Sequence, residues 1–249
     1  MTQTPVARTE EELLAVEIGG AAVGENLRRA IEAGELIEHA DGTLEVAHVE
    51  SAQPWMYVHY GPSLGCDFLM RFAFRRAYAE GAVPSGCQAC YKVKVVPRTL
   101  RELIAAWQIG KRTPCQSKWG VDLNNPHSQN VYAGYFYATG LDGARAIYRL
   151  VREAIDADPR LGPEITMTIK RGCSEYEAAL GPSDQYTFSP ELAEVEAYLR
   201  TRFRKSAPAK TTGAPMAYWI DMAFRMGDDT YLDCTGGKRL RPKTLTYEP

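Results

Sequence analysis

Apolar and polar residues alternate along the middle of the chain with two different periods. The segment 91–97, YKVKVVP, places valine and lysine at alternate positions, which is the two-residue period of a strand with one buried face. In 98–110 the apolar residues fall on one helical stripe instead, and Thr99 with Glu102 matches the capping-box pattern of a helix start. A strand followed by a helix is therefore predicted for this segment.

The same two periods continue further along the chain. Segments 118–123 and 164–170 alternate apolar with polar residues, whereas 131–139 is apolar or aromatic on both faces, as in a central strand. Thr139 and Asp142 cap a helical pattern that lies between the last two strands. The order β-α-β-β-α-β predicts an α+β fold with a ferredoxin-like βαββαβ central layer, in which the strands pair in the order 4-1-3-2.

The flanking segments are predicted to pack around this layer. An amphipathic helix is expected at 191–206, and 216–237 is predicted to form a β-hairpin with its turn at Gly227-Asp228. The predicted organisation has three parts: an N-terminal helical and β segment at 1–50, a cysteine-bearing core domain at 51–190, and a C-terminal helix and hairpin packed on the core at 191–249.

Composition narrows the class of protein. The chain has 249 residues, 45% of them hydrophobic, and a formal net charge of −2, which suits a folded domain and argues against a dedicated nucleic-acid binder. No apolar run reaches the length of a membrane span, and the early acidic residues differ from the basic-then-apolar order of a signal peptide. We therefore expect a cytoplasmic protein without a membrane partner, in which cysteines stay reduced.

Four of the six cysteines fall at one end of the predicted sheet. Cys87 and Cys90 form a C-x-x-C pair directly before the first strand, Cys115 lies three residues before the second, and Cys173 follows the fourth. The first and fourth strands are neighbours about 5 Å apart in the 4-1-3-2 order, so Cys173 is expected close to the pair. Cys66 is an alternative ligand if the loop bearing Cys115 points away.

A group of thiols of this kind selects a [4Fe–4S] cluster or zinc. Structural zinc sites more often use two C-x-x-C pairs, so one pair with two distant cysteines favours the wider cluster. If only three cysteines bind the cluster, one iron is open to substrate. The remaining alternatives are a metal-free dithiol and buried free cysteines.

Charged residues near the cysteines suggest a substrate and a chemistry. Basic residues adjoin two of the thiols, where they can bind an anionic substrate or offset the charge of a cluster: Lys111, Arg112, Lys170 and Arg171. Glu175 and His59 are candidate acid–base groups, although solvated carboxylates and backbone-bonded histidines are commoner.

The leading hypothesis is an iron–sulfur enzyme that performs redox or sulfur chemistry on a small anionic molecule, or exchanges electrons with a redox partner protein. The main alternative is a zinc-stabilised binding protein without catalysis, which contacts nucleic acid through the basic end at 238–247.

Overall fold

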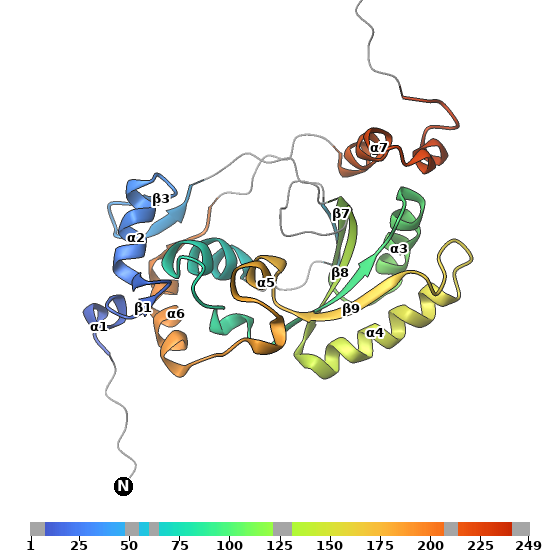
Figure 1. The fold of residues 1–249 in the computed structure, drawn as a ribbon. Coiled ribbons are helices and arrows are strands. Elements are labelled where there is room, and N and C mark those ends of the chain that lie inside the picture. The colour runs from blue at the N-terminus through green and yellow to red at the C-terminus, as the bar shows by residue number, and fades with distance from the viewer. Residues whose placement is uncertain (1–7, 48–54, 60–64, 122–130, 207–213, 241–249) are drawn as a thin grey trace, which may run out of the picture.

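The main sheet of the protein has five strands. The computed structural model describes residues 8–47, 55–59, 65–121, 131–206 and 214–240. The strands are β5 (Trp55–Val58), β6 (Cys90–Val96), β7 (Ser117–Val121), β8 (Tyr132–Thr139) and β9 (Thr166–Arg171). They lie in the order β5-β7-β8-β6-β9, and all neighbouring pairs are antiparallel. Helices α3 (Leu100–Arg112) and α4 (Gly140–Asp156) pack on this sheet (Figure 1).

The α+β class predicted from the sequence is confirmed. The ferredoxin-like layer is not confirmed as predicted, because β5 adds a fifth strand beside β7. The other four strands lie in the order β9-β6-β8-β7. The sequence analysis missed β5 because Trp55–Val58 is apolar or aromatic throughout and lacks the alternation that identifies a strand.

The two faces of the sheet differ in chemistry. Val93 and Val95 of β6 pack with Phe136 of β8 into the hydrophobic core beneath α3 and α4. The alternate residues point to the opposite face, where Lys92 of β6 is paired with Tyr137 on one side and Lys170 on the other. The lysines of the segment YKVKVVP therefore lie on the face opposite α3 and α4.

A second hydrophobic core joins the N-terminal elements to those that follow the sheet. The N-terminal elements are α1 (Glu10–Leu14), β1 (Glu17–Ile18), β2 (Ala21–Ala22), α2 (Val23–Glu32), β3 (Leu36–Glu38), β4 (Leu44–Val46), the π-helix η1 (Asp67–Ala77) and the short 3-10 helix η2 (Ser85–Cys87). The later elements are α5 (Ser174–Leu180), η3 (Ser183–Gln185), α6 (Pro190–Arg202) and β10 (Phe203–Arg204). Helix α6 packs against α1, η1 and η2, and β10 pairs with β4 in parallel, so segments far apart in sequence lie side by side (Figure 1).

The predicted C-terminal hairpin at 216–237 is wrong. This segment forms helix α7 (Pro215–Arg225) and the 3-10 helix η4 (Asp229–Cys234). Trp219 and Ala223, four residues apart, give α7 one fully buried face, and Pro215 suits the first turn of a helix. Gly227 has φ +77° and follows the C-cap residue, so it ends a helix instead of turning a hairpin.

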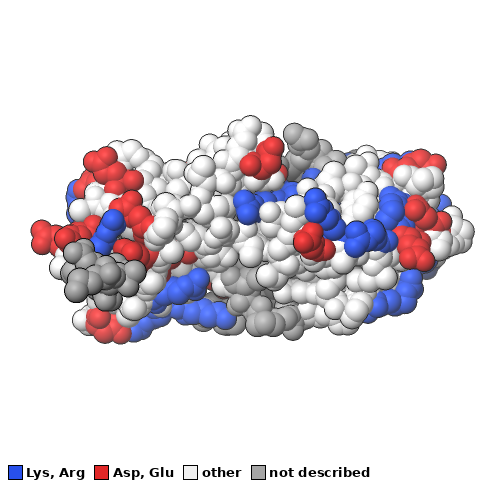
Figure 2. All heavy atoms as spheres, turned by 90° about the horizontal axis from the view of Figure 1, so that it is seen from below, with Lys and Arg blue, Asp and Glu red and all other residues white. Residues whose placement is uncertain are grey.

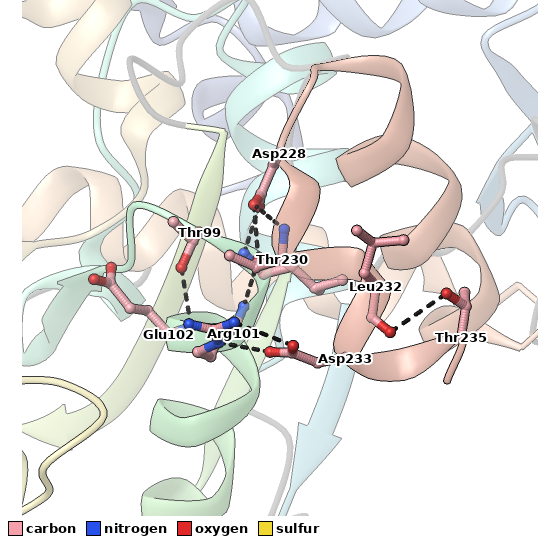
Figure 3. Close-up of polar contacts among 9 residues, drawn as sticks. Thr99, Arg101, Glu102, Asp228, Thr230, Leu232, Asp233 and Thr235 are labelled. Carbon is pink, nitrogen blue, oxygen red and sulfur yellow. Dashed lines mark hydrogen bonds and ion pairs between the residues drawn. The ribbon is translucent and has the colours of Figure 1, made fainter. Parts of the chain in front are cut away.

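Polar contacts attach the C-terminal segment to the start of α3 (Figure 3). The carboxylate of Asp228 accepts hydrogen bonds from the backbone N–H of Leu100 and from the hydroxyl of Tyr132, both at 2.6 Å. The guanidinium of Arg101 binds the carboxylate of Asp233 at 2.5 Å, and the backbone N–H of Arg101 donates to the hydroxyl of Thr230. Asp228, which was predicted to lie in a hairpin turn, therefore attaches η4 to the start of α3.

The surface carries charges of both signs. Figure 2 shows Lys and Arg interspersed with Asp and Glu, and acidic side chains are prominent at the end that carries α1. Among the described residues, no helix combines the length and the apolar character needed to cross a membrane.

Candidate thiol site and pocket

Three cysteines meet where β6 begins and β9 ends. Cys90 is the first residue of β6, and Cys173 follows β9, the strand paired with β6. The backbone N–H of Gly172 donates to the carbonyl of Cys90 at 2.9 Å, which fixes the two segments against each other. Helix η2 places the thiol of Cys87 beside them, and this side chain is only 5% exposed.

Cys66 is the fourth cysteine at this place. It directly precedes η1 and lines the same pocket as Cys173. It is close enough to Cys90 and Cys173 for their charges to interact with its own. Cys115 is half-buried and packs instead with the core between the sheet and its two helices. Cys66 thus lines the same pocket as Cys173, whereas Cys115 packs in the other core.

A buried lysine lies among these thiols. Lys92 is 5% exposed, and its ammonium group donates a hydrogen bond to the sulfur of Cys173 at 3.1 Å. The same ammonium lies 5.5 Å from the ring centre of Tyr137. Burial lowers the pKa of Lys92, but Cys173, Tyr137 and Cys90 raise it further than burial lowers it. The lysine therefore stays protonated beside the thiols.

A buried tyrosine reaches the C-x-x-C pair. The hydroxyl of Tyr176, from α5, lies 3.3 Å from the sulfur of Cys87. Its ring packs edge-on against Phe74 of η1, with ring centres 4.5 Å apart. Gly172 has φ +70°, and a Cβ atom there would lie 2.7 Å from Cδ2 of Tyr176. Glycine is thus required at this position for the tyrosine to pack as it does.

The thiols themselves are not arranged as a reactive dithiol. Burial raises the pKa of Cys87 to about 12, although the Tyr176 hydroxyl lowers it in part. Burial likewise raises the pKa values of Cys90 and Cys66, while Lys92 lowers them in part. Redox and nucleophilic cysteines have lowered pKa values, so these thiols lack the property typical of a reactive dithiol.

A pocket of about 210 Å³ opens beside the thiols. Its walls come from η1, from five strands on the sheet face opposite α3 and α4, and from the start of α5. The charged residues that line it are Asp67, Arg71, Lys92, Lys118, Lys170 and Glu175. The ammonium of Lys118 lies 4.2 Å from the ring centre of Trp55 and 5.1 Å from that of Tyr135, while Lys170 donates to the hydroxyl of Ser174. Cations outnumber carboxylates on these walls, so the pocket suits an anion.

The remaining predicted site residues divide between this pocket and other places. Lys170 and Glu175 line it. The guanidinium of Arg171 instead donates to the carbonyl of Gln88 and lies over the ring of Phe188. The ring of His59 contacts the carbonyl of Lys111 at 2.9 Å.

The ammonium of Lys111 lies over Trp107 of the same helix, 3.9 Å from the ring centre, and Arg112 is exposed where α3 ends. Most of the basic end at 238–247 lies outside the described residues.

The sequence analysis missed Lys92, Lys118 and Tyr176. The alternation of lysine with valine in 91–97 already put Lys92 on the face opposite the core. The segments that bury this face, η1 and α5, are distant in sequence, so the pattern contained no signal that the lysine would be buried.

The thiols do not form a closed metal site in this arrangement. Within the described residues, no group of three or more His, Cys, Asp and Glu side chains is placed to hold a metal ion.

Comparison with known proteins does not assign the chain to a family. No family model matches it, and neither a curated protein nor a solved structure does. The site is therefore interpreted from its own residues.

Proposed function

We propose that this protein binds a [4Fe–4S] cluster through Cys66, Cys87, Cys90 and Cys173. One observation carries the proposal: thiols from three separate places in the sequence lie near the ammonium of Lys92, which donates to Cys173 at 3.1 Å. A buried cation next to several thiols is costly unless it offsets negative charge, and a cluster bound by four thiolates supplies that charge. Cys66 takes the place of Cys115, which packs in the other core.

The pocket supports an enzyme more than an electron carrier. A carrier needs no cavity beside its cluster, whereas this cavity has Cys66 and Cys173 in its wall. Arg71, Lys118 and Lys170 line this cavity, Arg71 beside Asp67 and Lys170 in an ion pair with Glu177, and their positive charge favours a small anion next to the cluster. Because Cys66 is the most exposed of the four thiols, it is also the ligand whose absence would leave one iron open to substrate.

The proposal extends to the fold and the compartment. The sheet is interpreted as a ferredoxin-like layer widened by β5, since β9-β6-β8-β7 reproduces the 4-1-3-2 order. A reducing compartment such as the cytoplasm suits a site that needs free thiols.

Anaerobic purification, or reconstitution with iron and sulfide, tests the proposal. We expect a brown protein with broad visible absorption and about four irons per chain. Replacing Cys87, Cys90 or Cys173 with Ser should abolish cluster binding, and Cys66→Ser should lower iron content or leave a three-iron cluster. Cys115→Ser is the matched control and should retain the full cluster.

A zinc protein is the alternative that the same measurement separates. Colourless protein with about one zinc per chain would replace the cluster with a structural zinc site. Protein without iron or zinc after reconstitution would contradict both.

A further inference from the structure

A nearly buried ammonium group lies in the wall of the open pocket. Lys92 is 5% exposed and lines the pocket together with Cys173 and Tyr137. One of its three N–H donors reaches the sulfur of Cys173, and the ammonium lies 5.5 Å from the ring centre of Tyr137. A thiol and a phenol do not ordinarily carry charge at neutral pH. Within the part of the chain that the structure describes, no carboxylate forms an ion pair with Lys92, so its charge calls for an anion from the pocket.

A second lysine lies beside Lys92 on the same face of the sheet. Lys170 is the direct partner of Lys92 across β6 and β9, and like charges on directly opposed residues repel each other. Burial, and to a smaller extent the charge of Lys92, lower the pKa of Lys170, although Glu177 raises it in part. Lys170 also donates to the hydroxyl of Ser174, which lines the pocket as well. An anion at the two lysines would relieve their repulsion and neutralise Lys92.

The pocket has room for more than an ion, and part of its wall is aromatic. Its volume is about 210 Å³, whereas one water molecule occupies roughly 30 Å³ of the liquid. Tyr57, Tyr135 and Tyr137 line it and alternate with lysines across the strands. In the strand register Tyr57 and Tyr135 are both opposite Lys118, and Tyr137 is opposite Lys92. The pocket thus offers cations next to an aromatic surface, against which a ring can pack.

We propose that this pocket binds a small phosphate monoester, with its phosphate at Lys92 and Lys170 and its body against the tyrosines. Such a phosphate carries roughly −1.5 to −2 charges at neutral pH and has three acceptor oxygens, so it can accept hydrogen bonds from both ammonium groups and from Ser174 at once. A carboxylate has one charge and two oxygens, and it matches this set of donors less well. The inference rests on the proposed function only for the small anion in this pocket, and it requires no metal at the thiols.

Isothermal titration calorimetry of the wild-type protein with inorganic phosphate, phenyl phosphate and benzoate tests the proposal. Phenyl phosphate should bind most tightly, because inorganic phosphate lacks the ring and benzoate replaces the phosphate with a carboxylate. Equally tight binding of benzoate overturns the preference for phosphate, and equally tight binding of inorganic phosphate overturns the role of the tyrosines. Absence of phenyl phosphate binding overturns the site.

Lysine variants locate the binding. Lys92→Met should weaken phenyl phosphate binding roughly ten- to hundredfold, which corresponds to the loss of a charged hydrogen bond. Lys94→Met is the matched control, because it removes the same charge from the same face of β6 but outside the pocket wall. Unchanged binding in Lys92→Met, or equal weakening in the two variants, overturns the proposal. If Lys92→Met fails to fold, Lys170→Gln decides: weaker binding supports the proposal and unchanged binding overturns it.

The iron content of the same protein after reconstitution separates this inference from the proposed function. Protein without iron that binds phenyl phosphate at these lysines supports the inference and contradicts the cluster. Protein that holds about four irons per chain but does not bind phenyl phosphate overturns the inference and leaves the cluster in place.

Discussion

Lys92 occupies a strand position that would usually point to solvent, yet it is almost completely buried. Helix α5, which follows Lys92 in the sequence, and η1, which precedes it, cover its face of the sheet at this end. Burial of an amine is tolerated when the charge has partners, and Cys173 and Tyr137 provide them. The residues most informative about function are thus the ones that depart from the simple strand pattern.

Gly172→Ala tests how tightly Tyr176 is held. An alanine at φ +70° costs roughly 1–2 kcal/mol for the left-handed backbone alone. Its Cβ would also lie 2.7 Å from the ring of Tyr176, so the total loss of unfolding free energy should exceed this. Urea unfolding measures the loss. Gly20→Ala is the control, because Gly20 has φ +84° with open space around it. Equal losses in the two variants would show that the ring yields freely.

At the scale of elements, α6 holds the loop that carries the C-x-x-C pair. The carboxylate of Glu196 is 5% exposed and accepts hydrogen bonds from the backbone N–H groups of Ser85 and Gly86, the latter at 3.0 Å. The loop packs closely against η1, because a Cβ at Gly86 would lie 2.7 Å from Cδ2 of Leu69. Helix α6 therefore fixes the position of Cys87 from about a hundred residues away in the sequence.

Glu196→Ala should destabilise the protein more than a surface change does. It leaves two backbone N–H groups without their acceptor, at roughly 1–3 kcal/mol each where they are buried. Urea unfolding gives the total, and faster hydrogen exchange at Ser85 and Gly86 localises it. Glu194→Ala, on the same helix, removes an exposed carboxylate 3.6 Å from Arg8 and should cost little. Unchanged exchange at the two amides would contradict the role of Glu196.

The anchor of η4 on α3 should depend on pH through Asp228. Burial alone raises the pKa of this carboxyl, but hydrogen bonds from Tyr132, Thr230 and Leu100 lower it further, so the net pKa lies below its usual value. The stabilisation is therefore complete above the unfolded-state pKa of about 3.9 and is lost as the pH falls through the folded-state pKa. At neutral pH the wild type should have a higher free energy of unfolding than Asp228→Asn. At acid pH the two values should become equal. The exposed Asp229→Asn is the control, and a difference that persists in acid would contradict the assignment.

The same segment shows where sequence patterns are sufficient and where they are not. Strands β6 and β9 and helices α3 and α4 were predictable because each has a long, regular period against one core. The Gly227-Asp228 pair was misread because glycine with positive φ ends a helix as readily as it turns a hairpin. The closeness of Cys90 to Cys173 was predictable from strand order, but the position of Cys66 on the pocket, with Cys115 in the other core, depends on the packing of η1, which no local pattern encodes.

At the scale of the whole molecule, the thiols lie where the chain passes between its two hydrophobic cores. Cys66 stands where the chain has left β5 for η1, Cys87 and Cys90 where it leaves η2 for β6, and Cys173 where it leaves β9 for α5. Figure 1 shows the elements of the two cores side by side. A group that bonds to all four thiols would join the cores at three places at once.

Cluster removal should therefore weaken the coupling between the cores as well as lower stability. A ligand that binds only the folded state raises the melting temperature, and the bonds of the proposed cluster would also tie η1, η2 and α5 to the sheet. Calorimetry of the loaded protein should give one sharp transition at higher temperature. After anaerobic chelation of iron, we expect a lower and broader transition, or two transitions. Cys115→Ser, whose thiol lies within the sheet core, should behave as wild type in both states. Identical melting curves before and after chelation would contradict this role of the cluster. They would mean that packing and the polar contacts of Lys92 and Glu196 are sufficient to hold the segments between the two cores.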